Sequence, residues 1–210
     1  ILESGRAVAL IDSPNPLSLN LEGRVADVMR GIDWLEEVAD GGLLDFDRLG
    51  ITGHSMGGSE SFALSRLDRR VRTAVSMAPG WPPNPARGLG QRTNTVIENA
   101  LSMDGPEVRI IGARHDRVVK ADDYARYLSD RCTNCEYVEM NHAGHNNFAD
   151  MPVPGVPGLI RGRSGDRLGR VDVTALSSRV ATGQRQRLEA ANLVTQWFDQ
   201  VLGVSPYSAH

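Results

Sequence analysis

The segment Gly53-His54-Ser55-Met56-Gly57-Gly58 places a serine between glycines in the pattern G-x-S-x-G. It lies between an apolar strand pattern at Leu49–Thr52 and a helical pattern at Met56–Leu67, the context in which a tight turn exposes a serine hydroxyl. Glycines are expected there because side chains flanking Ser55 would collide with neighbouring backbone, and the helix start favours negative charge. The pattern indicates a nucleophilic serine. The alternative is a glycine-rich turn that binds phosphate or does no chemistry.

A serine hydroxyl is a weak nucleophile and needs a base that a third group orients. Asp116 follows the apolar pattern Val108–Ile111, and His145 follows the apolar pattern Tyr137–Met140. If these patterns are parallel strands, their carboxyl ends meet at one edge of a sheet. We therefore expect Ser55, His145 and Asp116 to form a nucleophile–base–acid triad.

Other acids and histidines compete for these roles. Asp122 and Asp123 fall within the expected helix Val119–Leu128, where they would face solvent. His142 shares a short loop with His145, but the glycine before His145 supplies a flexible loop tip, which favours His145. The remaining histidines are expected to be structural, adjacent to the acid or terminal: His54, His115 and His210.

The apolar periodicity predicts an α/β fold with a mostly parallel sheet and crossover helices. The expected strands are Arg6–Asp12, Leu49–Thr52, Val71–Met77, Val108–Ile111 and Tyr137–Met140. The expected helices are Leu21–Val38, Met56–Leu67, Thr95–Leu101, Val119–Leu128 and Gln184–Leu202. Residues 152–182 are rich in Gly and Arg and are expected to form an irregular surface excursion of a single domain that covers residues 1–210.

Composition limits the classes of partner. The net charge of −3 over 210 residues is too weak to favour nucleic acid. No apolar run approaches the roughly 18 residues that a membrane span needs, and no signal peptide is visible at residue 1. No metal or cofactor is implied. Localisation, secreted or cytoplasmic, stays open.

Cys132 and Cys135 form the pattern C-x-x-C and are the two cysteines of the chain. A redox motif would open a helix of a thioredoxin-like unit, and a zinc site would need two further ligands. Neither context is present in the sequence. Two plain cysteines and a small loop disulfide both remain possible, and a disulfide would point to an exported protein.

Several motifs together resemble one family. The run from Leu2 to Phe148 resembles the lipase/esterase branch of the α/β-hydrolases, particularly cutinase-like polyester hydrolases and platelet-activating-factor acetylhydrolase-like enzymes. The resembling pieces are LESGRAVALIDSP, the R-x-x-D of Arg24 and Asp27, GHSMGG, MAPGW, GARHDRVV and HAGHNNF. The run that contains them in this order covers about two thirds of the chain.

The resemblance implies a carboxylic ester hydrolase that acts through an acyl-enzyme on a small-molecule or polymeric ester. It implies the triad Ser55–His145–Asp116 and an oxyanion hole that uses the backbone N–H of Met56. Trp81 loosely matches a tryptophan that stacks on substrate in the polyester hydrolases, and a packing role is the alternative. Thioester or peptide cleavage on the same triad, or a non-catalytic binding module with this fold, are the alternative functions.

The sequence departs from the family at its start. In the family, the first strands and the loop that gives the second oxyanion donor precede the segment LESGRAVALID. We therefore expect an N-terminally truncated α/β-hydrolase fold, with about five parallel strands and an uncovered sheet edge beside Arg6–Asp12. A missing oxyanion donor would cost about 3 kcal/mol of transition-state stabilisation. The chain expressed alone is expected to be poorly soluble or nearly inactive.

Overall fold

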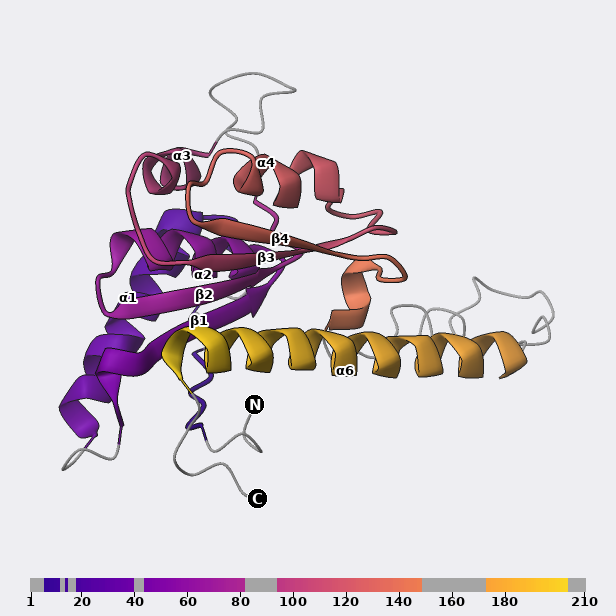
Figure 1. Cartoon of the computed structure of the whole chain (residues 1–210), viewed down its shortest axis with the longest axis horizontal. Helices are drawn as coiled ribbons and strands as arrows, with labels where there is room; N and C mark the ends of the chain where they lie inside the picture. Colours follow the sequence, from indigo (N-terminus) through magenta and orange to yellow (C-terminus); the bar gives the residue numbers. More distant parts are fainter. Residues whose placement is uncertain are drawn as a thin grey trace.

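A computed structural model describes residues 6–11, 14, 18–39, 44–81, 94–148 and 173–203, without the side chains of 147 and 173–182. Four strands form one all-parallel sheet in the order β1-β2-β3-β4. They are β1 (Leu49–His54), β2 (Val71–Met77), β3 (Val108–Ala113) and β4 (Cys135–Met140). The α/β class and the parallel sheet are thus confirmed, and Figure 1 shows the strands side by side.

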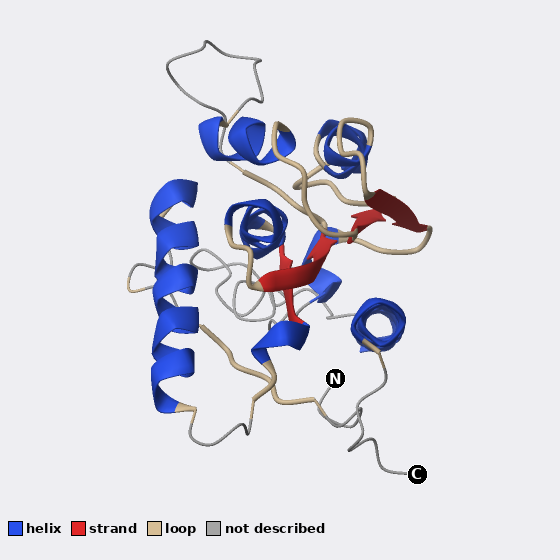
Figure 2. Cartoon of the chain, turned by 60° about the vertical axis from the view of Figure 1, so that its left-hand side comes forward, coloured by secondary structure: helices blue, strands red, loops and turns tan. Residues whose placement is uncertain are grey.

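Helices cover both faces of this sheet (Figure 2). On one face, α2 (Met56–Leu67) and α4 (Ala125–Ser129) pack against the strands. Helices α1 (Leu21–Val38) and α3 (Thr95–Leu101) pack against α2 and belong to the same apolar cluster. The other face packs against α6 (Val173–Leu202). Side chains alternate between the faces: Ile110 of β3 belongs to the first cluster, and Ile111 belongs to the second. The fold is therefore a three-layer sandwich that holds the strand ends rigidly.

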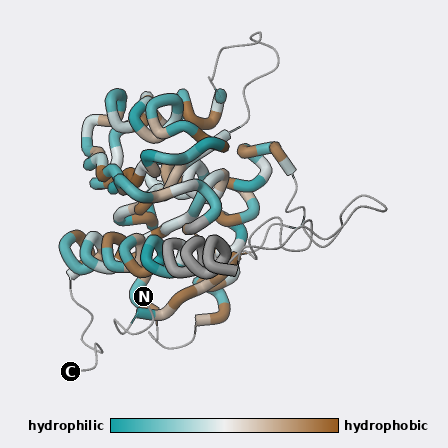
Figure 3. The backbone as a smooth tube through the Cα atoms, turned by 90° about the vertical axis from the view of Figure 1, so that its right-hand side faces the viewer, coloured by the Kyte–Doolittle hydropathy of each residue, from teal (hydrophilic) through white to brown (hydrophobic). Residues whose placement is uncertain are grey.

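Helix α6 is amphipathic, and Figure 3 shows hydrophobic and hydrophilic residues alternating along it. Ala190, Val194, Trp197 and Phe198 are buried against the sheet. The Trp197 indole N–H donates to the Thr73 hydroxyl at 2.7 Å, and the Arg109 guanidinium lies 4.6 Å from the Trp197 ring centroid. These contacts fix α6 across β2 and β3.

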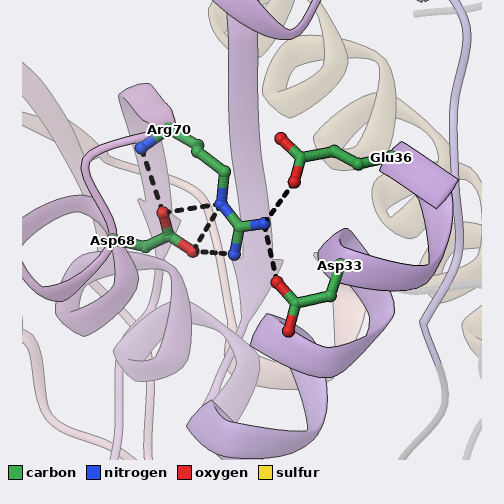
Figure 4. A network of polar contacts seen from close by, with 4 residues as sticks. All are labelled: Asp33, Glu36, Asp68 and Arg70. Atoms are coloured by element: carbon green, nitrogen blue, oxygen red, sulfur yellow. Dashed lines mark hydrogen bonds and ion pairs between the residues drawn. The ribbon is translucent and has the colours of Figure 1, made fainter.

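The outer helix α1 is tied to the turn between α2 and β2 by one arginine (Figure 4). Arg70 contacts Asp68 at 2.6 Å, Asp33 at 2.7 Å and Glu36 at 2.8 Å. Hydrogen bonds from Arg70 lower the pKa of Asp68, against the opposing effect of its burial. The network joins α1 to the end of α2.

The expected strand Arg6–Asp12 does not form: residues 6–11 have no regular structure, and Asp12 lies outside the described residues. Leu10 is 95% exposed, while Ile11 lies against Gly31 of α1. The Arg6 side chain bonds to Gly203 O at 3.0 Å and to Asp199 at 2.6 Å. An apolar pattern becomes a strand only where a neighbour supplies ladder hydrogen bonds, and here side-chain contacts to helices hold the segment instead. Among the described residues the sheet has four strands, and β1 has a strand neighbour on one side.

The expected helix Val119–Leu128 is wrong in its first half. The structure has a 3-10 turn, η5 (Ala121–Asp123), followed by the short helix α4. The N–H groups of Val118 and Val119 donate to the Asp116 carboxylate. The α-helix itself begins only after Tyr124, at Ala125.

Two further sequence expectations are corrected or resolved. Residues 173–182, expected to be irregular, belong to α6, because Gly183 costs a helix only about 1 kcal/mol and does not end it. Residues 152–172 lie outside the described residues.

Cys132 and Cys135 form a disulfide. Within the described part of the chain, no helix is long and apolar enough to cross a membrane.

Candidate active site

Ser55 stands at the carboxyl end of β1, immediately before α2, with φ 59° and ψ −120°. A positive φ is strained for a residue that has a Cβ atom. Three hydrogen bonds hold it: Ser55 N–H donates to Met77 O at 2.9 Å, and Ser55 O accepts from the N–H groups of Gly80 at 3.1 Å and Ser59 at 3.2 Å. The strained turn is therefore fixed by both β2 and α2.

The glycines around Ser55 differ in their steric role. A Cβ atom on Gly53 would lie 2.3 Å from Gly57 O, and one on Gly58 would lie 2.8 Å from Met77 O. A Cβ atom on Gly57 would meet no atom within 4 Å. The expectation that both glycines of G-x-S-x-G avoid collisions holds for Gly53 and is wrong for Gly57, whose α-carbon faces open space.

We expect Gly53→Ala to destabilise the fold by about 3 kcal/mol or more, because the backbone of α2 must move to admit the methyl group. Gly57→Ala is the matched control. It should leave stability unchanged or raise it by up to about 1 kcal/mol, since alanine favours a helix over glycine. Urea unfolding of both variants measures the difference, and equal losses of stability would contradict the steric assignment.

The structure brings the three residues of the predicted triad together. His145 Nε2 lies 3.0 Å from Ser55 Oγ, and His145 Nδ1 lies 2.6 Å from Asp116 Oδ2. Because a carboxylate can only accept, Nδ1 carries the hydrogen and Nε2 is free to accept from the serine hydroxyl. Both His145 and Asp116 are buried. The arrangement is that of an activated nucleophile.

Asp116 is held from two sides. Its Oδ2 accepts from His145, while its Oδ1 accepts from the N–H groups of Val118 at 2.8 Å and Val119 at 2.7 Å. The loops that carry the acid and the base are also joined, since His115 N–H donates to Ala143 O at 2.9 Å. Backbone bonds therefore set the distance between acid and base.

The competing residues are elsewhere. His142 and His115 are exposed, and His210 lies outside the described residues. Asp122, in η5, pairs with Arg126 at 2.9 Å rather than with a histidine. Among the described residues, His145 and Asp116 are thus the histidine and carboxylate that are hydrogen-bonded in series to Ser55.

Gln186 is a site residue that the sequence analysis missed. Its side-chain oxygen accepts from Gly144 N–H at 3.0 Å, and its amide nitrogen donates to Gly144 O at 2.9 Å. This α6 side chain therefore bonds both backbone polar groups of Gly144, the residue immediately before His145. The available signal was a glutamine in the buried stripe of α6, four residues before Ala190.

His54 lies against the base. Its ring centroid is 4.6 Å from that of His145 and 5.2 Å from that of Phe148. Its Nε2 atom is buried and has no hydrogen-bond partner among the described residues. Burial lowers the pKa of His54 to about 4, and the proximity of His145 acts in the same direction. His54 is therefore neutral near pH 7, and its uncharged ring packs beside the ring of His145.

We expect this burial to make stability depend on pH. The unfolded state, with a histidine pKa of 6.5, binds a proton more readily than the folded state, with a pKa of about 4. The free energy of unfolding should therefore fall by about 3 kcal/mol as the pH drops from 6.5 to 4. His54→Phe keeps the ring and removes the titration, so the difference between wild type and variant across this window measures the effect. Parallel pH profiles would contradict it.

The other two predicted site residues occupy different environments. Met56 is the first residue of α2, and N–H groups of a first turn have no acceptor within the helix. Trp81 is 4% exposed, with its ring 4.8 Å from Tyr124 in an edge-on arrangement. This burial favours the packing role of Trp81 over stacking on a substrate.

The described residues contain no group of three or more His, Cys, Asp or Glu that could hold a metal ion. No protein-family model matches the sequence, and no curated protein matches it either. The assignment of function therefore depends on the geometry of the site.

Proposed function

We propose that this chain is a serine hydrolase that cleaves carboxylic esters through an acyl-enzyme, on an α/β-hydrolase fold. The observation that carries the proposal is the continuous hydrogen-bonded path from Ser55 Oγ through His145 to Asp116. The strained Ser55 turn between β1 and α2 supports it further. The substrate class is a small-molecule or polymeric ester.

In the proposed reaction, Ser55 Oγ attacks the ester carbonyl while His145 Nε2 takes its proton. His145 then delivers that proton to the departing alkoxide, which leaves the acyl group on Ser55. A water molecule enters, gives its proton to His145 and hydrolyses the acyl-enzyme. Asp116 keeps Nδ1 protonated and stabilises the imidazolium that forms in each half-reaction.

The developing oxyanion needs donors close to Ser55. The N–H of Met56 is suited to this role because it is at the start of α2, where the helix dipole also favours negative charge.

Pre-steady-state hydrolysis of p-nitrophenyl acetate by the purified chain tests the proposal. Because the amplitude of the burst does not depend on fast turnover, we expect even a slow chain to give a burst of p-nitrophenolate stoichiometric with enzyme. We also expect a mass increase of one acetyl group that peptide mapping locates on Ser55. A thioester and a peptide substrate, assayed in parallel, distinguish other acyl transfers on the same triad. Absence of both the burst and the acyl adduct would point to a non-catalytic binding module.

Gln186 is a positioning residue in this proposal. Gln186→Leu leaves two half-buried backbone groups of Gly144 without their side-chain partner, so we expect it to lower stability by about 1 to 2 kcal/mol. It should also lower kcat by about tenfold with little change in KM, because the base is displaced and no substrate contact is lost. Gln196→Leu, on the exposed side of α6, is the matched control. An unchanged kcat in Gln186→Leu would contradict the role.

A further inference from the structure

The disulfide Cys132–Cys135 closes the turn at the amino end of β4, whereas His145 follows the carboxyl end of that strand. Both cysteines are half-buried, while Thr133 and Asn134 between them are exposed. A small thiol can therefore approach the turn from solvent. This disulfide differs from an ordinary loop crosslink because a buried arginine side chain, that of Arg66, contacts it.

Arg66, in the last turn of α2, points at the two sulfur atoms. Its Nη2 lies 2.8 Å from Cys132 Sγ and 3.7 Å from Cys135 Sγ. The residue is 5% exposed, and its Nη1 is buried without a hydrogen-bond partner among the described residues. The Arg66 guanidinium is thus a buried cation whose polar contacts are neutral sulfur atoms.

Burial of this kind is costly for a charged group. It lowers the pKa of Arg66, against the opposing attraction of Asp104, which is exposed and therefore screened by solvent. A negative charge on either sulfur would supply the missing counter-charge. Reduction of the disulfide creates that charge, because a thiol next to an arginine ionises readily.

We propose that Cys132–Cys135 is a thiol–disulfide exchange site for low-molecular-weight thiols, with Arg66 stabilising Cys132 as the leaving thiolate. In thioredoxin-like units a helix N-terminus stabilises the thiolate; in this chain a residue far away in sequence does so. The proposal is independent of the ester hydrolysis proposed above.

The exchange takes place in two balanced steps. The thiolate of a small thiol attacks Cys135 Sγ, the S–S bond breaks, and its electron pair leaves on Cys132 Sγ, which faces Arg66. A second thiolate then attacks the small-molecule sulfur of the mixed disulfide. It releases the symmetrical small-molecule disulfide and leaves Cys135 reduced. The small thiol is oxidised, and the protein gains two electrons.

Other charged groups around the turn are less suited to this role. Arg131 is exposed, and its guanidinium stacks 4.0 Å from the Tyr127 ring centroid. Glu136, next to Cys135, is paired with Arg109 at 2.7 Å. Arg66 is therefore the charged residue to vary, and Arg131 is the control.

Two single-cysteine variants of the full chain test the assignment of the thiolate. Cys135→Ser leaves Cys132 close to Arg66, and Cys132→Ser leaves Cys135 farther away. We expect the rate of iodoacetamide alkylation to report an apparent pKa at least about one unit lower for Cys132 than for Cys135. Equal values, or a Cys132 pKa at or above about 8.5, would overturn the proposal.

Equilibration of the wild-type chain with reduced and oxidised glutathione tests the exchange itself. We expect reversible reduction under native conditions, with the glutathione adduct trapped on Cys135. Arg66→Met should lower the equilibrium constant for reduction at least about tenfold, which corresponds to about 30 mV, while Arg131→Met should leave it unchanged. Reduction that requires denaturant, or an equal effect of the two variants, would overturn the proposal. If Arg66→Met does not fold, the alkylation experiment still tests whether Cys132 is the stabilised thiolate, because it does not use this variant.

Discussion

Ser55→Ala is expected to lower kcat for an activated ester by about a millionfold, to the level that remains when a nucleophile of this type is removed. Alanine cannot form the acyl-enzyme, and no other described hydroxyl is bonded to His145 Nε2. The backbone should be unaffected, because alanine has the same Cβ atom and bears the same strain at φ 59° as serine. Steady-state kinetics with p-nitrophenyl acetate measures the loss.

The control for this variant is Ser102→Ala. Ser102 is exposed at the end of α3 and bonds its hydroxyl to Asn99 O at 2.7 Å, away from the triad. We expect it to keep full activity, and both variants to unfold at the wild-type temperature. Wild-type turnover by Ser55→Ala would remove Ser55 from the role of nucleophile.

Local signals explain which elements could be predicted from the sequence. Helices α1 and α3 both begin after an asparagine whose side chain caps the first turn: Asn20 accepts from Gly23 N–H, and Asn94 accepts from Val96 N–H. Their bounds were predicted correctly from apolar periodicity, which depends on neighbouring residues, and the structure shows that an asparagine cap is present at the start of each helix. Strand Val71–Met77 was predicted for a similar reason, as a run of β-branched and apolar residues.

The wrong predictions concern segments whose apolar pattern does not by itself determine their structure. The pattern of residues 6–12 resembles that of a strand, but a strand also needs a neighbour to bond with. The helix expected from Val119 begins only after Tyr124, because a separate 3-10 turn, η5, precedes α4. Neither departure can be predicted from apolar periodicity alone.

The triad itself was accessible to sequence reasoning because each member directly follows a strand, and parallel strands end at one edge. The residues that support it were not. Gln186 bonds to Gly144 across 42 positions, and Arg66 approaches Cys132 across 66 positions. The sequence indicates such contacts only weakly, through a polar residue on a helix face that is otherwise apolar.

Asp116→Asn is expected to lower kcat by about ten-thousandfold while the fold persists. The side-chain oxygen of the introduced asparagine can still accept from the N–H groups of Val118 and Val119, so the loop keeps its bonds. The amide nitrogen of the asparagine then faces His145 Nδ1 and donates to it. This forces the hydrogen of the imidazole onto Nε2, and Nε2 can then no longer accept the proton of Ser55.

The matched control for Asp116→Asn is Asp122→Asn, the same change at the neighbouring acid that pairs with Arg126. We expect Asp122→Asn to keep wild-type kcat, and Asp116→Asn to keep the wild-type KM, because Asp116 acts through His145 and is buried away from the substrate. Burst amplitude separates the steps: a slow acylation phase without a fast burst places the defect at the attack of Ser55. A kcat for Asp116→Asn equal to that of Asp122→Asn would show that the short bond between Asp116 and His145 does not orient the base.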